Sequence, residues 1–167
     1  MKNVFVIFLV LILQDSFSQE NKNSEKADVD QYIKEATVTK YLVLAGVSND
    51  FNALDNLAKQ ISKKTGIKYE NGLEYDKKRG MIVPDTSSDV IYAGSYFPRR
   101  DDDEKISIEM LWYYKNEQND ADSSRQMIII TGIFGNKKNA ETQLNSVKSI
   151  VPSAYIKKKG IFMGCMH

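Results

Sequence analysis

Aromatic and charged side chains of the kind that bind sugars gather between residues 92 and 114 of the chain. Each aromatic has an apolar ring with a polar edge, which suits the apolar face of a sugar ring at a partly wet site. An arginine and a glutamate among them offer hydrogen bonds to hydroxyl and acetamido groups. The candidate ligand-binding residues are Tyr92, Tyr96, Arg99, Glu109, Trp112 and Tyr114. The alternative is that the aromatics only pack this stretch against the core.

Metal-binding patterns are weak in this sequence. The run Arg99–Glu104 clusters carboxylates, which hard cations prefer, but its own arginines already offer them partners. Asp120–Ser124 begins like a calcium loop, yet Arg125 and Thr131 stand where that motif needs Gly and Glu. Cys165 and His167 are the only Cys and the only His, too few for a closed zinc site. We therefore expect no metal and no cofactor.

The sequence also lacks a convincing catalytic set. No Ser/His/Asp or Cys/His group is placed within a core that would form a pocket. A glycosidase needs two carboxylates in one cleft, and Glu109 is the only acidic residue expected in the middle of a strand on an open face. The expectation is a protein that is not an enzyme.

Two segments of similar pattern must position the candidate residues. Met127–Ala140 reads as an apolar strand, a Gly near its end, a polar turn capped by Asn136, and the start of a helix. Lys40–Ala53 repeats this order, with Gly46 in the place of Gly132. The same order of strand, glycine, turn and helix start in both segments predicts an internal repeat of two β-α-β halves.

Each half carries an apolar helical stripe. The stripes predict helices over Phe51–Lys64, ending at Gly66, and over Lys137–Val151, with Leu57 and Leu144 at their centres. The returning strands are Ile67–Tyr69 and a segment that starts at Tyr155. Two such halves related by a pseudo-twofold axis give an antiparallel sheet with both helices on one face. The opposite face is then open for a ligand.

The stretch between the halves alternates apolar and polar residues twice. We expect a β-hairpin with strands Asp89–Pro98 and Lys105–Asn116, inserted between the halves and extending the sheet. All the candidate ligand-binding residues lie on or beside this hairpin. The predicted fold class is therefore α+β.

The segment Tyr41–Lys157 resembles the SPOR (sporulation-related repeat) domain, a peptidoglycan-binding module of secreted and cell-division proteins. The residues that carry the resemblance are Leu42–Asn49 with Asn52-Ala53, and Ile129–Phe134 with Asn139-Ala140. The resemblance implies a ferredoxin-like βαββαβ domain whose exposed sheet face binds glycan strands that lack stem peptides. The chain departs from the family where Leu42-Val43-Leu44 replaces a common Gln. An alternative partner is a cell-envelope protein, bound through the same face or the sheet edge.

The N-terminal residues have the pattern of a secretory signal peptide. Lys2 precedes the apolar run Val4–Leu13, and small residues place a cleavage near Ser18/Gln19. The run is too short for a membrane span, although a short tethering helix is an alternative. We expect a signal peptide over residues 1–18, a leader over 19–39 with a short helix, and a single domain over 40–167. The protein would be exported and periplasmic or secreted, with no membrane span in the mature chain.

Charge and cysteine content limit the partners further. The formal net charge is +1, which argues against a general nucleic-acid binder. The single Cys165 excludes a disulfide within the chain. In an oxidising compartment an accessible Cys165 would form a disulfide-linked dimer.

Overall fold

The computed structural model of this chain describes residues 26, 28–88, 90–115 and 125–164. These residues fall into two compact units. The larger unit is Thr39–Ile161, and the smaller one comprises the described parts of residues 1–38 and 162–167. The predicted signal peptide, the Asp120–Ser124 loop and Cys165 lie outside the described residues.

In the smaller unit, residues 28–35 form a helix where the sequence predicts a short one. The rings of Tyr32 and Phe162 meet edge to face at 5.8 Å, and the backbone N–H of Met163 donates to the Ala36 carbonyl at 2.8 Å. Among the described residues, no helix combines the length and the apolar character needed to cross a membrane.

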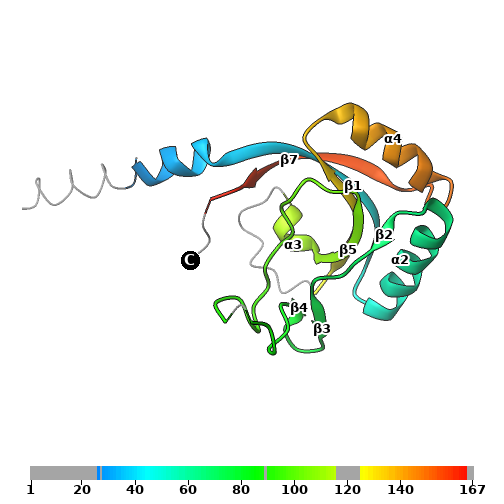
Figure 1. Cartoon of the computed structure of the whole chain (residues 1–167), viewed down its shortest axis with the longest axis horizontal. Helices are drawn as coiled ribbons and strands as arrows, with labels where there is room; N and C mark the ends of the chain where they lie inside the picture. The colour runs from blue at the N-terminus through cyan, green and yellow to red at the C-terminus, as the bar shows by residue number, and fades with distance from the viewer. Residues whose placement is uncertain (1–25, 27, 89, 116–124, 165–167) are drawn as a thin grey trace, which may run out of the picture. The chain divides into compact units, whose positions relative to one another are not determined.

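The α+β class predicted from the sequence is confirmed. Figure 1 shows the elements, which are β1 (Thr37–Ser48), α2 (Phe51–Thr65), β2 (Lys68–Tyr69), β3 (Glu74–Asp76), β4 (Gly80–Ile82), β5 (Lys105–Met110), α3 (Leu111–Tyr114), β6 (Met127–Phe134), α4 (Lys137–Lys148) and β7 (Tyr155–Phe162). The main sheet has the order β2-β5-β6-β1-β7, and β3 and β4 form a separate hairpin. The sheet is mixed, not antiparallel as expected, because β2 runs parallel to β5.

The start of α4 and the end of α2 follow the predicted chemistry, whereas α4 ends at Lys148 and not at Val151 as predicted. Asn136 caps α4, since its side chain accepts a hydrogen bond from the Asn139 N–H, and Asp50 caps α2 in the same way through Ala53. Gly66 ends α2 in the left-handed conformation, with φ at 76°. The two caps show that the repeated Asn-Ala dipeptides occupy different positions along their helices.

Gly46 and Gly132 do have corresponding roles. Both lie where the pairing of β1 with β6 shifts register. A Cβ on Gly46 would lie 2.9 Å from Cδ2 of Leu57 on α2, and one on Gly132 would lie 2.7 Å from Nε2 of Gln143 on α4. Each glycine therefore lets the helix of its own half approach the sheet closely.

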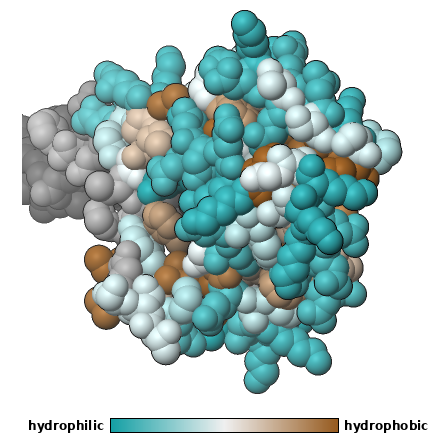
Figure 2. All heavy atoms as spheres, turned by 45° about the vertical axis from the view of Figure 1, so that its right-hand side comes forward, coloured by the Kyte–Doolittle hydropathy of each residue, from teal (hydrophilic) through white to brown (hydrophobic). Residues whose placement is uncertain are grey.

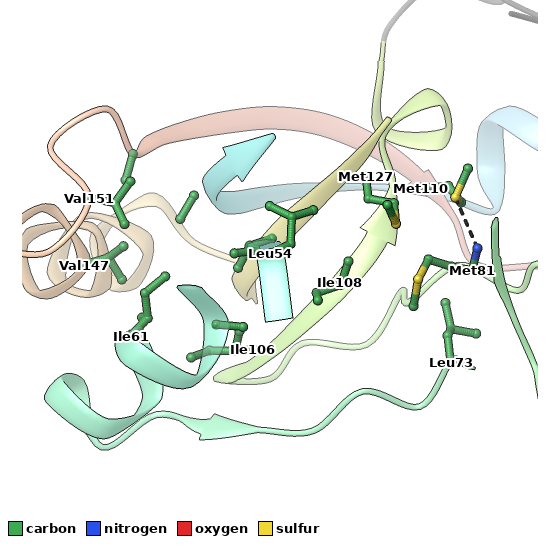
Figure 3. Packing of buried hydrophobic residues seen from close by; sticks show 14 residues of the cluster. Leu54, Ile61, Leu73, Met81, Ile106, Ile108, Met110, Met127, Val147 and Val151 are labelled. Atoms are coloured by element: carbon green, nitrogen blue, oxygen red, sulfur yellow. Dashed lines mark hydrogen bonds between the residues drawn. The ribbon is translucent and has the colours of Figure 1, made fainter. Parts of the chain in front are cut away.

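Both helices pack on the same face of the sheet, as expected (Figure 1). The core between them joins residues of α2, α4, β5 and β6, and Figure 3 shows Leu54, Ile61, Ile106, Ile108, Met127 and Val147 converging there. Leu57 and Leu144 are only partly buried. The most buried part of each helical stripe therefore lies at most one helical turn away from the residue predicted to be its centre. The outward helix surfaces are mainly hydrophilic, as the face in Figure 2 shows.

The opposite face of the sheet is not open, which corrects the expectation for a ligand face. Leu42 and Leu44 of β1 and Ile128 and Ile130 of β6 are buried there together with Tyr114 of α3. Figure 1 shows α3 on the side of the sheet away from α2 and α4. These strands are apolar on both faces, so leaving one face in water would be unfavourable.

The expected hairpin of Asp89–Pro98 with Lys105–Asn116 is also wrong. Residues 90–95 form turns and a bend, with Gly94 at a φ of 74° and a bridge between Ala93 and Val83, and residues 96–98 have no regular secondary structure. Strand β5 ends at Met110, opposite Met127, which is the first residue of β6. The next residue, Leu111, still donates its backbone N–H to the Gln126 carbonyl at 2.9 Å, and the chain then turns into α3.

The hairpin that the structure does contain is β3–β4, and it packs beside β5. The Met81 N–H donates to the sulfur of Met110 at 3.4 Å, as the dashed line in Figure 3 shows. The side-chain oxygen of Asn71 accepts from the Ile108 N–H at 3.2 Å. These contacts satisfy part of the edge of β5 beyond the short β2 pairing.

Candidate functional site

The candidate site is built on the face of β5 that points away from the two helices. Strand alternation sends Ile106, Ile108 and Met110 into the helix-side core. Ser107 and Glu109 therefore face the other way, and each is only 2% exposed. A hydroxyl and a carboxyl group buried on an otherwise apolar sheet need partners, and the segment Tyr96–Asp103 supplies them.

Arg99 holds this segment against β5. Its guanidinium donates to the Lys105 carbonyl at 2.7 Å, to the Ser107 hydroxyl at 3.1 Å and to the Asp103 carbonyl at 2.9 Å. It also contacts the Asp103 carboxylate. Burial lowers the pKa of Arg99 to about 10, so the guanidinium is still charged at neutral pH. Its buried Nε has no hydrogen-bond partner in the described part of the chain.

Glu109 is the most perturbed carboxyl group of the site. The Tyr96 hydroxyl donates to its Oε2 at 2.9 Å, and Ser107 and the Arg99 backbone also bond to it. Burial nonetheless raises the pKa of Glu109 to about 7, because the apolar surroundings penalise the charged form more than these bonds favour it. A perturbed carboxyl in a pocket is a common feature of functional sites.

The tyrosines that surround Glu109 keep their protons. Burial raises the pKa of Tyr96 and of Tyr114, and the nearby Glu109 carboxylate adds to both shifts. The Tyr114 hydroxyl donates to the Arg99 carbonyl at 2.8 Å. These phenols therefore act as hydrogen-bond donors that fix the segment in place.

A pocket of about 250 Å³ lies next to Arg99, Ser107 and Glu109. Ser107, Glu109 and Arg99 line its base, Leu73, Val83, Phe97 and Pro98 supply apolar walls, and the charged side chains beside them are Glu70, Arg100, Asp101 and Lys105. The guanidinium carbon of Arg100 lies 4.9 Å from the centre of the Phe97 ring. The pocket thus combines an apolar wall with hydrogen-bonding groups, as small-molecule sites do.

An aromatic cluster is connected to the pocket lining through Tyr96, which bonds to Glu109. The Trp112 ring meets Tyr96 edge to face at 5.4 Å, and Tyr113 follows at 6.1 Å from Trp112. Trp112 is 41% exposed, whereas Tyr114 is fully buried. The nitrogen of Lys159 on β7 lies 5.3 Å from the Tyr113 ring centre and donates to the Tyr113 and Lys115 carbonyls, which fixes α3 on the sheet.

Five of the six residues chosen from the sequence come together in space. Tyr96, Arg99, Glu109 and Tyr114 form one bonded network, and Trp112 contacts Tyr96. Tyr92 instead packs against Phe97, with ring centres 4.2 Å apart. Ser107, Lys105 and Phe97 also line the pocket, although they were not among the residues predicted from the sequence. The alternation of β5 is the signal that places Ser107 beside Glu109.

Two carboxylates of the acidic run before β5 are engaged with cations. Asp102 pairs with Lys40 at 2.8 Å, and Asp103 pairs with Arg99 and Lys105. In the part of the chain that the structure describes, no group of three or more His, Cys, Asp or Glu side chains is arranged to hold a metal ion. The acidic run thus acts here as a set of ion-pair partners.

Comparisons of the chain with protein-family models, with curated proteins and with solved structures find no match.

Proposed function

We propose that this chain is a non-enzymatic, exported binding module that holds peptidoglycan glycan strands at the aromatic cluster and pocket beside β5. The observation that carries the proposal is the contact of the exposed Trp112 with Tyr96, whose hydroxyl is bonded to Glu109 at the base of the pocket. An exposed indole on a rigid polar base can stack on a sugar ring while neighbouring groups bond to its substituents.

The topology supports the ferredoxin-like part of the proposal. Without β5, the order of the sheet would be β2-β6-β1-β7, with α2 and α4 on one face. This is the arrangement of a βαββαβ domain built from two β-α-β halves. Strand β5 is then an addition that separates β6 from β2, and it carries Glu109 and Ser107.

The proposed surface differs from the one that the SPOR resemblance implies. The central sheet face consists of Leu and Ile side chains under α3, so a glycan strand has no polar groups to bind there. Trp112 lies on α3 itself, and the pocket is lined by Arg99 and Glu109, which are bonded to Tyr114 and Tyr96. We therefore assign glycan binding to the outer surface of α3 and to the pocket beside β5.

Retention on purified cell-wall sacculi tests the proposal. Sacculi would be prepared with and without amidase treatment, because the amidase removes stem peptides and enriches bare glycan. We expect retention that increases after amidase treatment and falls for Trp112→Ala. Tyr155→Ala is the matched control, since Tyr155 is an exposed aromatic residue on β7, outside the site. Absence of retention on both preparations would reject glycan binding.

A partner protein is the second candidate, and the position of β7 favours it. β7 is the last strand of the sheet, so its outer edge offers backbone hydrogen bonds to an added strand. Lys157 and Lys158 on that strand would favour an acidic partner segment. Crosslinking in intact cells that captures one protein through β7, combined with no retention on sacculi, would select this candidate.

A further inference from the structure

We propose that the pocket beside β5 takes one uncharged sugar ring, and that its occupation is coupled to the uptake of a proton by Glu109. The proposal rests on the proposed function for the identity of the ring as an N-acetylated sugar. Its two other parts, the neutrality of the ring and the proton, follow from the size, the charges and the burial of the pocket.

The pocket volume limits the occupant to about one ring. Sites for drug-sized ligands enclose about 300–1,000 Å³. At about 250 Å³ this pocket is smaller, so a glycan strand could place a single residue in it. The rest of the strand would lie outside the pocket.

The charges of the lining favour a neutral occupant. Three cationic groups and three carboxyl groups line the pocket, namely Arg99, Arg100, Lys105, Glu70, Asp101 and Glu109. Arg99 and Lys105 are already paired with Asp103. Since neither sign is in excess, a charged ligand would lose its hydration without gaining a matching counter-charge.

Glu109 is the group of the lining that an occupant would affect most. It is buried at the base, and the groups that face it are Tyr96 and Arg99 from the overlying segment, Tyr113 and Tyr114 from α3, and Ser107 from its own strand. Only the Arg99 guanidinium among them carries a charge at neutral pH, and it favours the ionised carboxylate. The phenols supply hydrogen bonds but no charge.

Filling the pocket replaces the solvent space beside the buried carboxyl group with a less polar sugar ring. This replacement penalises the charged form further, because desolvation already dominates the environment of Glu109. The bound state therefore holds a proton on Glu109 to higher pH than the free state does. Binding of a neutral ring should then take up a proton near pH 7 and weaken as the pH rises.

Isothermal titration calorimetry on the whole exported chain tests this coupling. The probe is N,N′-diacetylchitobiose, a neutral disaccharide of N-acetylated rings, titrated at several pH values between 6 and 8.5. Two buffers of different ionisation enthalpy report the number of protons taken up, with no need for a variant. We expect net proton uptake near pH 7, and an affinity that falls by about tenfold for each unit by which binding raises the pKa of Glu109.

Variants identify the group that takes up the proton. Glu109→Gln keeps the size of the side chain and a carbonyl acceptor, and it should bind the probe with no proton uptake and no pH dependence. Glu74→Gln is the matched control, because Glu74 is exposed on β3 and does not line the pocket, and His167→Gln removes the only histidine of the chain. Both should retain the proton uptake. Chitobiose with free amino groups should bind more weakly than the acetylated probe.

Each outcome decides between the two proposals. Proton uptake of zero, pH dependence that survives in Glu109→Gln, or no binding of the acetylated probe at any pH would overturn the coupling. Retention on sacculi without such coupling would leave the proposed function in place and reject this inference. Binding of the probe with proton uptake, but without retention on sacculi, would support the coupling and reject the proposed function.

Discussion

The Tyr96 hydroxyl donates a hydrogen bond of 2.9 Å to the Glu109 carboxyl group, and this bond joins the loop before β5 to the buried face of that strand. Tyr96 also meets the exposed Trp112 edge to face. One tyrosine thus connects a buried ionisable group to the aromatic cluster. Substitutions at Tyr96, Glu109 and Trp112 can therefore be used to measure separately the stability, its dependence on pH, and ligand binding.

The stability of the protein should fall as the pH rises from about 4.5 to about 7. The pKa of Glu109 is raised from 4.5 to about 7 in the folded chain, so the folded state binds more protons than the unfolded state in this range. Its contribution is fully present below the unfolded pKa and is lost as the pH passes the folded pKa, a change of about 3 kcal/mol. Urea unfolding between pH 5 and 8.5 measures it.

Glu109→Gln should remove most of that slope. The carboxyl groups of Asp76 and Asp85 have lowered pKa values and therefore act in the opposite direction, but they titrate at lower pH. A stability that is equally dependent on pH in Glu109→Gln and in the unmodified protein would show that Glu109 is not buried as described.

Tyr96→Phe should raise the pKa of Glu109 further. The tyrosine hydrogen bond is one of the interactions that lower this pKa, so its loss leaves burial less opposed. We also expect a loss of about 1–3 kcal/mol in the unfolding free energy at pH 8, where the carboxylate would miss a donor. Titration of carboxyl ¹³C signals and urea unfolding at pH 5 and pH 8 measure the two effects.

The matched control for this substitution is Tyr69→Phe. Tyr69 donates its hydroxyl to Asp55 at 3.0 Å, on the other side of the sheet from Glu109. It should leave the titration of Glu109 unchanged. An equal shift in both variants would mean that the effect does not pass through the Tyr96 bond.

Trp112→Ala should weaken glycan binding by about 1 kcal/mol or more, roughly fivefold or more, with little effect on folding. The reason is that Trp112 is exposed on α3, whereas Tyr114 fills the core beneath it. Thermal unfolding and binding of chitohexaose measure the two effects. A large drop in the melting temperature of Trp112→Ala would instead make this residue part of the core.

Gly46→Ala should destabilise the protein more than Gly66→Ala. Both glycines have a positive φ, at 79° and 76°, so alanine strains the backbone at both, by about 1–2 kcal/mol. A Cβ on Gly46 would also crowd Leu57 at 2.9 Å, while nothing lies within 4 Å of one on Gly66. We expect the crowding to add about 1–3 kcal/mol. Equal unfolding free energies in the two variants would show that α2 does not approach β1 so closely.

The apolar patterns of the sequence determined the strands and helices of the two repeated halves. A few neighbouring residues are enough to predict these elements, because apolar periodicity and helix capping are local. Examples are the β-branched run Ile128–Ile130 and the helical stripes after Asp50 and Asn136. The positions of β1, α2, β6 and α4, and the end of α2 at Gly66, could therefore be predicted.

Only the tertiary structure decided what happens between the halves. The alternating pattern of Lys105–Asn116 is compatible with one long strand, but β5 ends at Met110, which lies opposite the first residue of β6, Met127. Leu111–Tyr114 then form a helix, and Tyr114 of this helix covers the sheet face that was predicted to be open. The burial of Glu109 depends on the same event and on the loop held by Arg99, which are contacts between residues distant in the chain. Local sequence patterns carry no information on such contacts, so the raised pKa of Glu109 and the pocket above it could be seen only in the folded chain.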